Sequence, residues 1–271
     1  MSILDSILAG VRQDVARRQA LTPLEVIKER AARQPSARQV IPVLRSGAGP
    51  VTIIAEVKRA TPGLGWLADI PDPTTLAKLY EAGGASMISV ATEERSFAGS
   101  LADLDAVRRA VDIPVLCKDF ILSSYQIHEA RAHGADCVLL VVSTLEQAAL
   151  EAFIERTHSL GMTAGVEVNS RLEARRAVDA GAKLIGINNR DRRTLEVDRS
   201  TFAQVADVIP SDVTLVAASG VRDTHDVAAY FKAGAHSVLV GQTLVKSGDP
   251  AAAIRAFISA CTHPSLGPNR H

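Results

Sequence analysis

The sequence predicts an α/β fold, namely a (β/α)8 barrel of the TIM type with an N-terminal helical extension. Short β-rich runs alternate with segments of helical period along most of the chain. Glycine also recurs where a helical segment gives way to the next β-rich run, as in Ala180-Gly181-Ala182 and Ala233-Gly234-Ala235. Glycine allows the left-handed turn that ends a helix, so these joints are expected to be helix-to-strand loops. Eight such units would place an active site at the carboxyl ends of the strands.

Residues 1–50 are the predicted extension. Apolar residues repeat at helical spacing from Ile3 to Val15, and a second helix is expected to start with Thr22 as its N-cap and Pro23 at its first helical position. The segment from Ser46 to Pro50 then forms a linker. Two short helices cannot bury a core of their own, so we expect this segment to be a prefix to the fold rather than a separate domain.

Residues 51–271 are the predicted barrel. Its helical segments include residues 73–82 and 146–158. A doubly wound open sheet is the alternative fold, and the lack of a G-x-G-x-x-G turn after the first β-rich run disfavours it. The expected strands begin near Val51, Ser86, Pro114, Asp136, Thr163, Leu184, Val213 and Ser237.

Composition and charge exclude several classes of protein. With 47% hydrophobic and 22% charged residues and a formal net charge of zero, the chain is expected to be globular and not to bind nucleic acid. The arginine pairs at 17–18, 175–176 and 192–193 are most simply solvated faces. Three cysteines without paired or metal-ligand spacing fit the cytoplasm. We expect neither a signal peptide nor a membrane span.

An acid and a base stand at the end of the first predicted strand. Glu56 and Lys58 lie two residues apart in IIAEVK, so they share one face of the strand while Val57 takes the other. Lysine and glutamate are rarely buried without a partner, so the pair is either mutually neutralising or placed to act on a charged ligand.

Polar residues also end later strands. They are Lys118 in VLCKDF, Glu167 in AGVEVN, Asn188 in IGINNRD and Ser219 in VAASGVR. The carboxyl ends of barrel strands meet at one face, so these residues are candidates for an active site. A ring of structural ion pairs in the barrel mouth is the alternative.

The last two predicted strands end in glycine. Ser219-Gly220 and Gly241-Gln242 each precede a helical segment, and (β/α)8 barrels frequently bind phosphate at the loops after strands seven and eight. Glycine lets an anion approach backbone N–H groups and a helix N-terminus. The pattern predicts a small phosphorylated substrate.

Several segments, in this order and spacing, resemble the indole-3-glycerol-phosphate synthase family of tryptophan biosynthesis: IAEVKRATP, ISVATEERSFAGS, PVLCKDF, GVEVN, IGINNRD, ASGV and VLVGQ. The resemblance covers the extension and the whole barrel. It implies a carboxy-lyase that closes 1-(2-carboxyphenylamino)-1-deoxyribulose 5-phosphate to indole-3-glycerol phosphate with loss of carbon dioxide and water. It implies neither a metal nor an organic cofactor. We expect a monomer or a weak homo-oligomer.

The resemblance also implies roles for the site residues. Lys118 matches the general acid of ring closure. Glu56, Lys58 and Glu167 are candidates for the second acid and the base of the dehydration, with the division of roles open, and Asn188 would orient a sugar hydroxyl. A surface ion pair is the alternative role of Arg190. The expected substrate-binding residues are Thr61, Phe120, Arg190, Ser219, Gly220, Gly241 and Gln242.

This chain departs from the family pattern mostly at strand ends. Ala91 replaces a leucine, and Ala218 and Gln242 replace glutamates. Without a glutamate at 218, Lys118 would lack a carboxylate partner unless another acid replaces it. The departures leave two alternative functions, a divergent paralogue acting on a related aminodeoxyribulose phosphate and a non-catalytic phosphate-binding barrel. A further change is Thr61-Pro62-Gly63-Leu64-Gly65 in place of S-P-S-K-G. Asn169, Ser143 and Cys117 also differ from the family pattern, and strand alternation turns Cys117 toward the helices.

Overall fold

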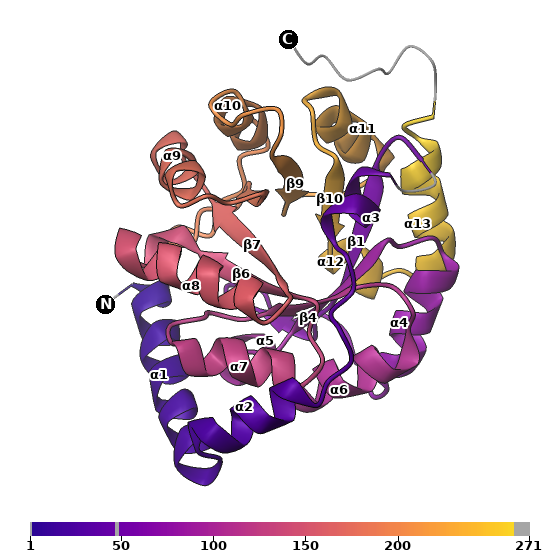
Figure 1. The fold of residues 1–271 in the computed structure, drawn as a ribbon. Coiled ribbons are helices and arrows are strands. Elements are labelled where there is room, and N and C mark those ends of the chain that lie inside the picture. The colour runs from indigo at the N-terminus through magenta and orange to yellow at the C-terminus, as the bar shows by residue number, and fades with distance from the viewer. Residues whose placement is uncertain (1, 47–48, 263–271) are drawn as a thin grey trace.

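The computed structural model describes residues 2–46 and 49–262 and shows a closed barrel of parallel strands, which confirms the predicted fold (Figure 1). The strand order around the barrel is β1-β10-β9-β8-β7-β6-β5-β4. Each strand begins at its predicted start or one residue after it. The barrel strands are β1 (Thr52–Val57), β4 (Met87–Ala91), β5 (Val115–Lys118), β6 (Cys137–Val141), β7 (Thr163–Val168), β8 (Leu184–Asn188), β9 (Thr214–Ala218) and β10 (Ser237–Val240).

Helices follow the strands and surround the barrel (Figure 1). The glycines at the joints Gly84, Gly134, Gly181 and Gly234 all have positive φ, between 81° and 97°, as the helix-ending turn requires. The covering helices are α4 (Pro73–Ala82), α6 (Leu101–Ala110), α7 (Ser124–Ala132), α8 (Gln147–Ser159), α9 (Arg171–Asp179), α10 (Thr201–Ala206), α11 (Thr224–Lys232) and α13 (Pro250–Ser259). Short additions at the carboxyl ends are β2 (Ala60–Thr61), β3 (Gly65–Trp66), α5 (Glu94–Phe97), the 3₁₀ turn η1 (Val142–Thr144) and α12 (Gln242–Val245).

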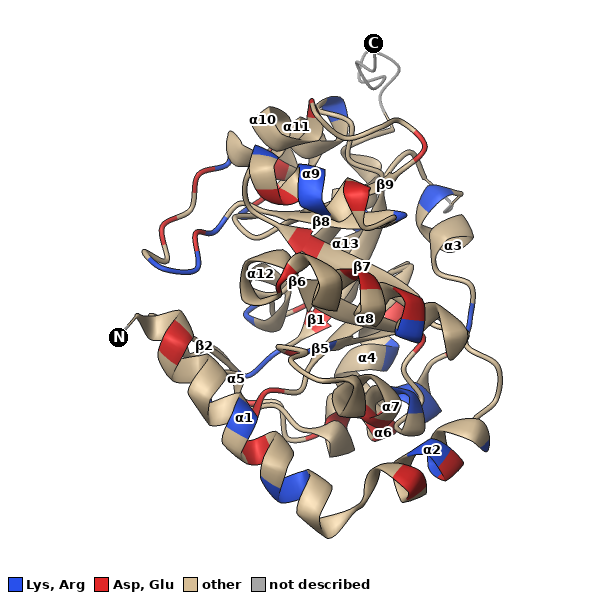
Figure 2. Ribbon diagram, turned by 60° about the vertical axis from the view of Figure 1, so that its left-hand side comes forward, with Lys and Arg blue, Asp and Glu red and all other residues tan. Residues whose placement is uncertain are grey.

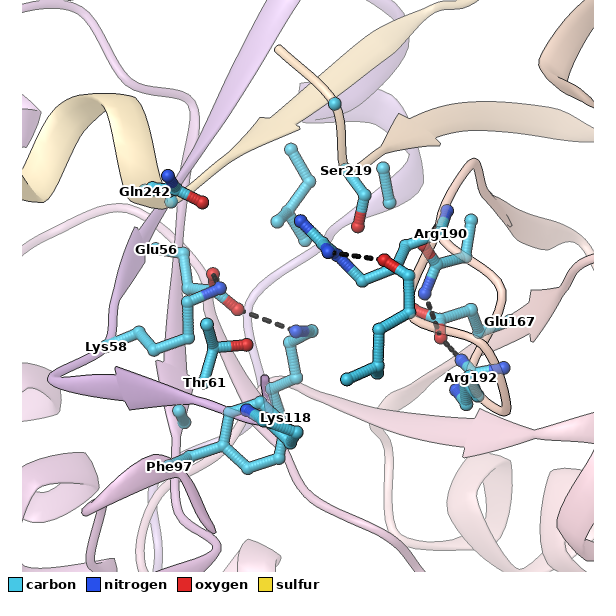
Figure 3. A pocket seen from close by; sticks show the side chains of 18 of the residues that line it. Glu56, Lys58, Thr61, Phe97, Lys118, Glu167, Arg190, Arg192, Ser219 and Gln242 are labelled. Carbon is cyan, nitrogen blue, oxygen red and sulfur yellow. Dashed lines mark hydrogen bonds and ion pairs between the residues drawn. The ribbon is translucent and has the colours of Figure 1, made fainter. Parts of the chain in front are cut away.

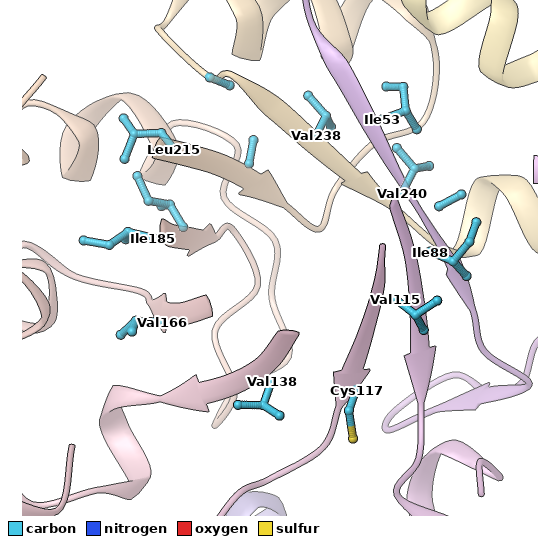
Figure 4. Close-up of a cluster of buried hydrophobic side chains, with 14 of the residues drawn as sticks. Ile53, Ile88, Val115, Cys117, Val138, Val166, Ile185, Leu215, Val238 and Val240 are labelled. Atoms are coloured by element: carbon cyan, nitrogen blue, oxygen red, sulfur yellow. The ribbon is translucent and has the colours of Figure 1, made fainter. Parts of the chain in front are cut away.

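Strand alternation separates two apolar layers. Ile53, Val115 and Val238 point outward and pack beneath the helices, in the cluster drawn in Figure 4. Complete burial of each such side chain contributes roughly 2 kcal/mol. Ile54 and Leu116 point into the barrel instead. The inward positions nearest the carboxyl ends are therefore free to carry the polar residues of a site.

The first of three helices before the barrel reaches its mouth, whereas the third lies at the amino ends of the strands, where Arg45 donates to Thr214. The three helices are α1 (Ile3–Leu21), α2 (Leu24–Ala32) and α3 (Ile41–Arg45). Leu4 and Leu8 of α1 belong to the same apolar cluster as Ile54 and Leu116 inside the barrel. Figure 2 shows α1 lying along the barrel on the side of β2 and α5.

The predicted start of the second helix is wrong. Thr22 is the C-cap of α1, because its N–H donates to the Arg18 carbonyl at 2.8 Å, and Pro23 is the N-cap of α2 with an extended backbone. Thr22 therefore ends α1 and lies one residue before the N-cap of α2. In the predicted linker, Gly47 and Ala48 lie outside the described residues.

The prediction that the paired arginines are solvated is wrong for one member of each pair. Arg18 binds the buried carboxylate of Glu129 through Nε and Nη2, at 2.8 and 2.9 Å. Arg176 donates to the Leu145 carbonyl at 2.6 Å. Arg192 meets Glu167 in the barrel mouth. Each partner comes from a distant segment, so local sequence could not reveal it. Across the described residues, we find no helix with the length and apolar character needed to cross a bilayer.

Candidate active site

A pocket of about 620 Å³ opens at the carboxyl ends of the barrel strands (Figure 3). Its volume lies in the range of small-molecule sites, about 300–1,000 Å³. The residues that the sequence singled out all line it, although their roles stay predictions. They are Glu56, Lys58, Thr61, Lys118, Phe120, Glu167, Asn188, Arg190, Ser219, Gly220, Gly241 and Gln242.

Glu56 holds both lysines. Its Oε1 accepts from Lys118 Nζ at 2.6 Å and its Oε2 lies 2.5 Å from Lys58 Nζ. Burial alone would raise the pKa of Glu56, but the two ammonium groups outweigh burial and lower it to about 2. Burial also lowers the pKa of Lys58, with Lys118 adding to the effect and Glu56 opposing it. The site therefore contains a permanent carboxylate that organises two potential proton donors.

Gly241 makes room for this arrangement. A Cβ at this position would overlap Glu56 Oε2 and would lie 3.2 Å from Lys58 Nζ. The backbone φ of Gly241 is −118°, which any residue can adopt, so the requirement for glycine comes from space. From the sequence, Gly241 was predicted only to bind phosphate, and its close approach to Glu56 was not predicted.

Glu167 forms a second charged centre on the opposite side of the pocket (Figure 3). Asn188 Nδ2 donates to Glu167 Oε1 at 3.0 Å, and the Arg192 guanidinium contacts the same carboxylate. Asn188 Oδ1 accepts from the Arg190 N–H at 2.9 Å, which fixes the direction of its amide. Asn188 is thus already bound to Glu167 and the backbone, an arrangement that the sequence did not indicate.

Arg190 does not form the surface ion pair that was its alternative role, and its role in substrate binding stays a prediction. Its Nη1 donates to the Leu195 carbonyl at 2.7 Å, and within residues 2–46 and 49–262 it forms no ion pair. Burial lowers the pKa of Arg190. Its side chain lines the pocket, so it adds positive charge there.

Two aromatic rings form an apolar wall beside Lys118. Phe97 and Phe120 lie 6.4 Å apart, and Lys118 Nζ is 6.0 Å from the centre of the Phe97 ring. Glu93 positions Phe97, because its carboxylate caps α5 by accepting from three backbone N–H groups. A flat apolar ligand group fits against this wall.

The loop after β9 presents unpaired N–H groups. Ser219 and Gly220 both have positive φ, 68° and 83°. Their carbonyls accept from Tyr230, Asn189 and Arg199. In the described part of the chain, the backbone N–H groups of residues 219–221 donate to no protein acceptor. Such a loop suits an anion.

A two-stranded hairpin overhangs the pocket. In it β2 pairs antiparallel with β3, and Arg59 anchors its base through Asp103. Gly63 at its tip packs against Leu195, from the loop that follows β8. Trp66 is 58% exposed and donates to Asp69.

The sequence interpretation missed several lining residues besides Arg192, Phe97 and Glu93. Asp119 follows Lys118 in KDF, and burial raises its pKa to about 6, although hydrogen bonds from Thr92 and the Phe120 N–H oppose the rise. Its place in the motif was a usable signal. The apolar lining from α1, Ile3, Leu4 and Ile7, had no such signal because it depends on how the extension folds back.

The departures from the family pattern fall into two groups. Leu64, Ala91, Ala218 and Gln242 line the pocket, whereas Cys117 is buried in the outer cluster, as alternation predicted. Glu56 is the acid that keeps Lys118 paired in the absence of a glutamate at 218. Outside the lining, Asn169 donates to the Asn188 carbonyl at 2.6 Å, and Ser143 is exposed in η1.

Comparisons with known proteins agree on one family. The family model described as indole-3-glycerol phosphate synthase matches residues 4–257. Proteins of that name are 56% identical in Beutenbergia cavernae, with all of both chains covered, and 58% identical in Rhodococcus opacus, with 98% of each covered. The protein of that name in Mycobacterium avium is 59% identical, with 97% of this chain and 96% of the relative covered.

Solved structures support the fold alone. A 3-hexulose-6-phosphate synthase superposes with a TM-score of 0.61 at 17% identity, over 78% of this chain and 99% of the other. Thiamine phosphate pyrophosphorylase from Pyrococcus furiosus gives 0.59 at 16% identity, over 78% and 96%.

Proposed function

The chain belongs to the indole-3-glycerol phosphate synthase family, and on that premise we propose how its pocket performs the family's reaction. That reaction converts 1-(2-carboxyphenylamino)-1-deoxyribulose 5-phosphate to indole-3-glycerol phosphate with loss of carbon dioxide and water. The observation that carries the proposal is the contact of Lys118 and Lys58 with the single carboxylate of Glu56, on the floor of a pocket with an aromatic wall.

Lys118 is the proposed acid for ring closure. The aromatic carbon that bears the carboxylate attacks the ribulose carbonyl, and Lys118 gives a proton to the carbonyl oxygen as the new carbon–carbon bond forms. Loss of carbon dioxide then restores the aromatic ring. The side chain of Lys118 can leave Glu56 for the substrate because it is only partly buried, with 19% of its surface exposed.

The dehydration needs an acid and a base. A carboxylate with a pKa of about 2 is a poor acid, so Glu56 is assigned to holding the lysines. Lys58 protonates the departing hydroxyl, because its lowered pKa favours release of a proton. Glu167, oriented by Asn188, removes the proton whose loss completes the pyrrole ring.

The phosphate is proposed to bind the loops after β9 and β10. The unpaired N–H groups of residues 219–221 point to this placement, with Gln242 and Thr61 nearby in the pocket lining. The aromatic part of the substrate then lies against Phe97 and Phe120. Arg190 adds positive charge for the phosphate or the carboxylate.

A fluorescence assay for the indole product tests the proposal. Wild-type protein should turn over the standard substrate, and Lys118→Met should lower kcat by about 10²–10⁴-fold with little change in KM. Lys183→Met is the matched control, because Lys183 is an exposed lysine paired with Asp212 outside the pocket. If Lys118→Met keeps more than roughly a tenth of the activity, Lys118 does not have this role.

Three further assignments complete the proposal. We propose that residues 1–50 act as an extension of the barrel, since α1 packs on the pocket lining. We propose that the protein works in the cytoplasm as a monomer or weak homo-oligomer. The reaction is proposed to need no metal or organic cofactor, so exhaustive dialysis against EDTA should leave kcat unchanged.

A further inference from the structure

A buried hydroxyl lies on the strand next to Glu56. Ser89 is fully buried on β4, and its Oγ has no hydrogen-bond partner among the residues that the structure describes. Its neighbours Ile88 and Val90 point outward into the helix-facing cluster, so Ser89 points into the barrel. An unpaired buried hydroxyl is unfavourable, so packing alone does not account for a serine at this position.

The position of β4 relates Ser89 to the reacting groups. This strand lies between β1 and β5, with Ser89 in register with Glu56 and Ala91 in register with Lys118. The hydrogen bond of Lys118 Nζ to Glu56 Oε1 therefore joins the two strands on either side of β4. Both residues that β4 places in register with this pair, Ser89 and Ala91, have small side chains.

The bond cannot persist through the proposed reaction. When Lys118 donates to the substrate, Glu56 Oε1 loses its partner, while Lys58 still occupies Oε2. Glu56 is 1% exposed, so water cannot easily replace the lost donor. A hydroxyl on the same barrel face, one strand away and in register, is suitably placed to do so.

We propose that Ser89 is a positioning residue that donates a hydrogen bond to Glu56 while Lys118 is engaged with the substrate. The Ser89 hydroxyl keeps its proton throughout and does not touch the substrate. It lowers the cost of separating Lys118 from Glu56, so it acts on the ring-closure step through Glu56. This inference rests on the acid role proposed for Lys118.

A double-mutant cycle tests the proposal without relying on activity. Urea unfolding is measured for wild type, Ser89→Ala, Lys118→Met and the double variant. Ser89→Ala alone should not lower the midpoint, because the change removes a hydroxyl that is unpaired while Lys118 holds Glu56. In the Lys118→Met background the same change should destabilise the native state and raise the unfolding equilibrium constant about tenfold, because Glu56 then depends on Ser89.

Kinetics supply the second readout. Ser89→Ala should lower kcat about tenfold with KM within about twofold of wild type. Ser237→Ala is the matched control: Ser237 is also fully buried, on β10, but its hydroxyl donates to the Thr52 carbonyl at 3.1 Å. That variant should lose stability and keep kcat.

Two results would overturn the role of Ser89. One is wild-type kcat in Ser89→Ala. The other is the same loss of stability from Ser89→Ala in both backgrounds, which would make the hydroxyl purely structural. Inactive wild-type protein, or an active Lys118→Met variant, would instead contradict the proposed function, and the unfolding cycle would still report on Ser89.

Discussion

Gly241→Ala is a small change that should have a large effect. The added methyl group would overlap Glu56 Oε2 and come within 3.1 Å of the Glu56 carboxyl carbon. The nearest atoms belong to a side chain that two lysines hold in place, so Glu56 can move aside only by lengthening its ion pairs with Lys58 and Lys118. The variant thus moves Glu56 away from Lys58 and Lys118 while all three charged side chains remain present.

The size of the effect follows from the ionisation of Glu56. Its ordinary pKa is 4.5 and its pKa in the folded protein is about 2, a difference worth about 3 kcal/mol of folding free energy at neutral pH. That energy measures how much more the folded protein favours the ionised form of Glu56 than its protonated form. Breaking a buried pair typically costs about 3–5 kcal/mol. We therefore expect Gly241→Ala to lower the free energy of unfolding by about 3 kcal/mol.

Urea unfolding and the indole fluorescence assay together measure the outcome. We expect a lower midpoint and a kcat reduced at least tenfold, since Lys118 loses the partner that positions it. Gly186→Ala is the matched control, because Gly186 lies in β8 and a Cβ there meets no atom within 4 Å. A Gly241→Ala variant that matches the Gly186→Ala variant in both measurements would refute the reasoning.

The remaining predictions concern charge and shape in the same pocket. Because the pKa of Glu56 is depressed, its ionisation contributes fully to the free energy of unfolding above pH 4.5, and this contribution is lost as the pH falls toward 2. Over that interval the free energy of unfolding should therefore fall more steeply with pH in wild type than in Glu56→Gln. Equal slopes in the two proteins would contradict this. Arg192→Met should reduce kcat about tenfold with little change in KM, because Glu167 keeps only Asn188 as a partner; an effect on KM alone would make Arg192 a binding residue. Ala91→Leu should lower KM about tenfold through added apolar contact beside Lys118; an unchanged KM would place the aromatic part of the substrate elsewhere.

The barrel was predictable because its signals are local. Alternation along a strand and a glycine at a helix end involve only neighbouring residues, so the strand starts were correct to within one residue. Alternation also placed Cys117 outward and Glu56 with Lys58 inward. Rules that act within a few residues fix the direction of a side chain even when its final partner is unknown.

Partners across the fold were not predictable. Nothing near Arg192 in the sequence indicates that it meets Glu167, and nothing near Gly241 indicates Glu56. From sequence alone, Thr22 could cap the end of one helix or the start of the next. In the structure its N–H donates to the Arg18 carbonyl, so it ends the first helix. Such features depend on distances between strands and loops, which single-sequence patterns do not contain.

The hairpin over the pocket also carries a natural optical probe. Trp66 is the only tryptophan in the chain, and its side chain is exposed to solvent beside the glycine-rich tip. Its emission therefore reports on one place in the molecule, without the overlapping signals that complicate spectra of proteins with several indole side chains. Stopped-flow fluorescence excited at the tryptophan band can follow the hairpin directly as a non-fluorescent phosphate ligand binds, with no label added.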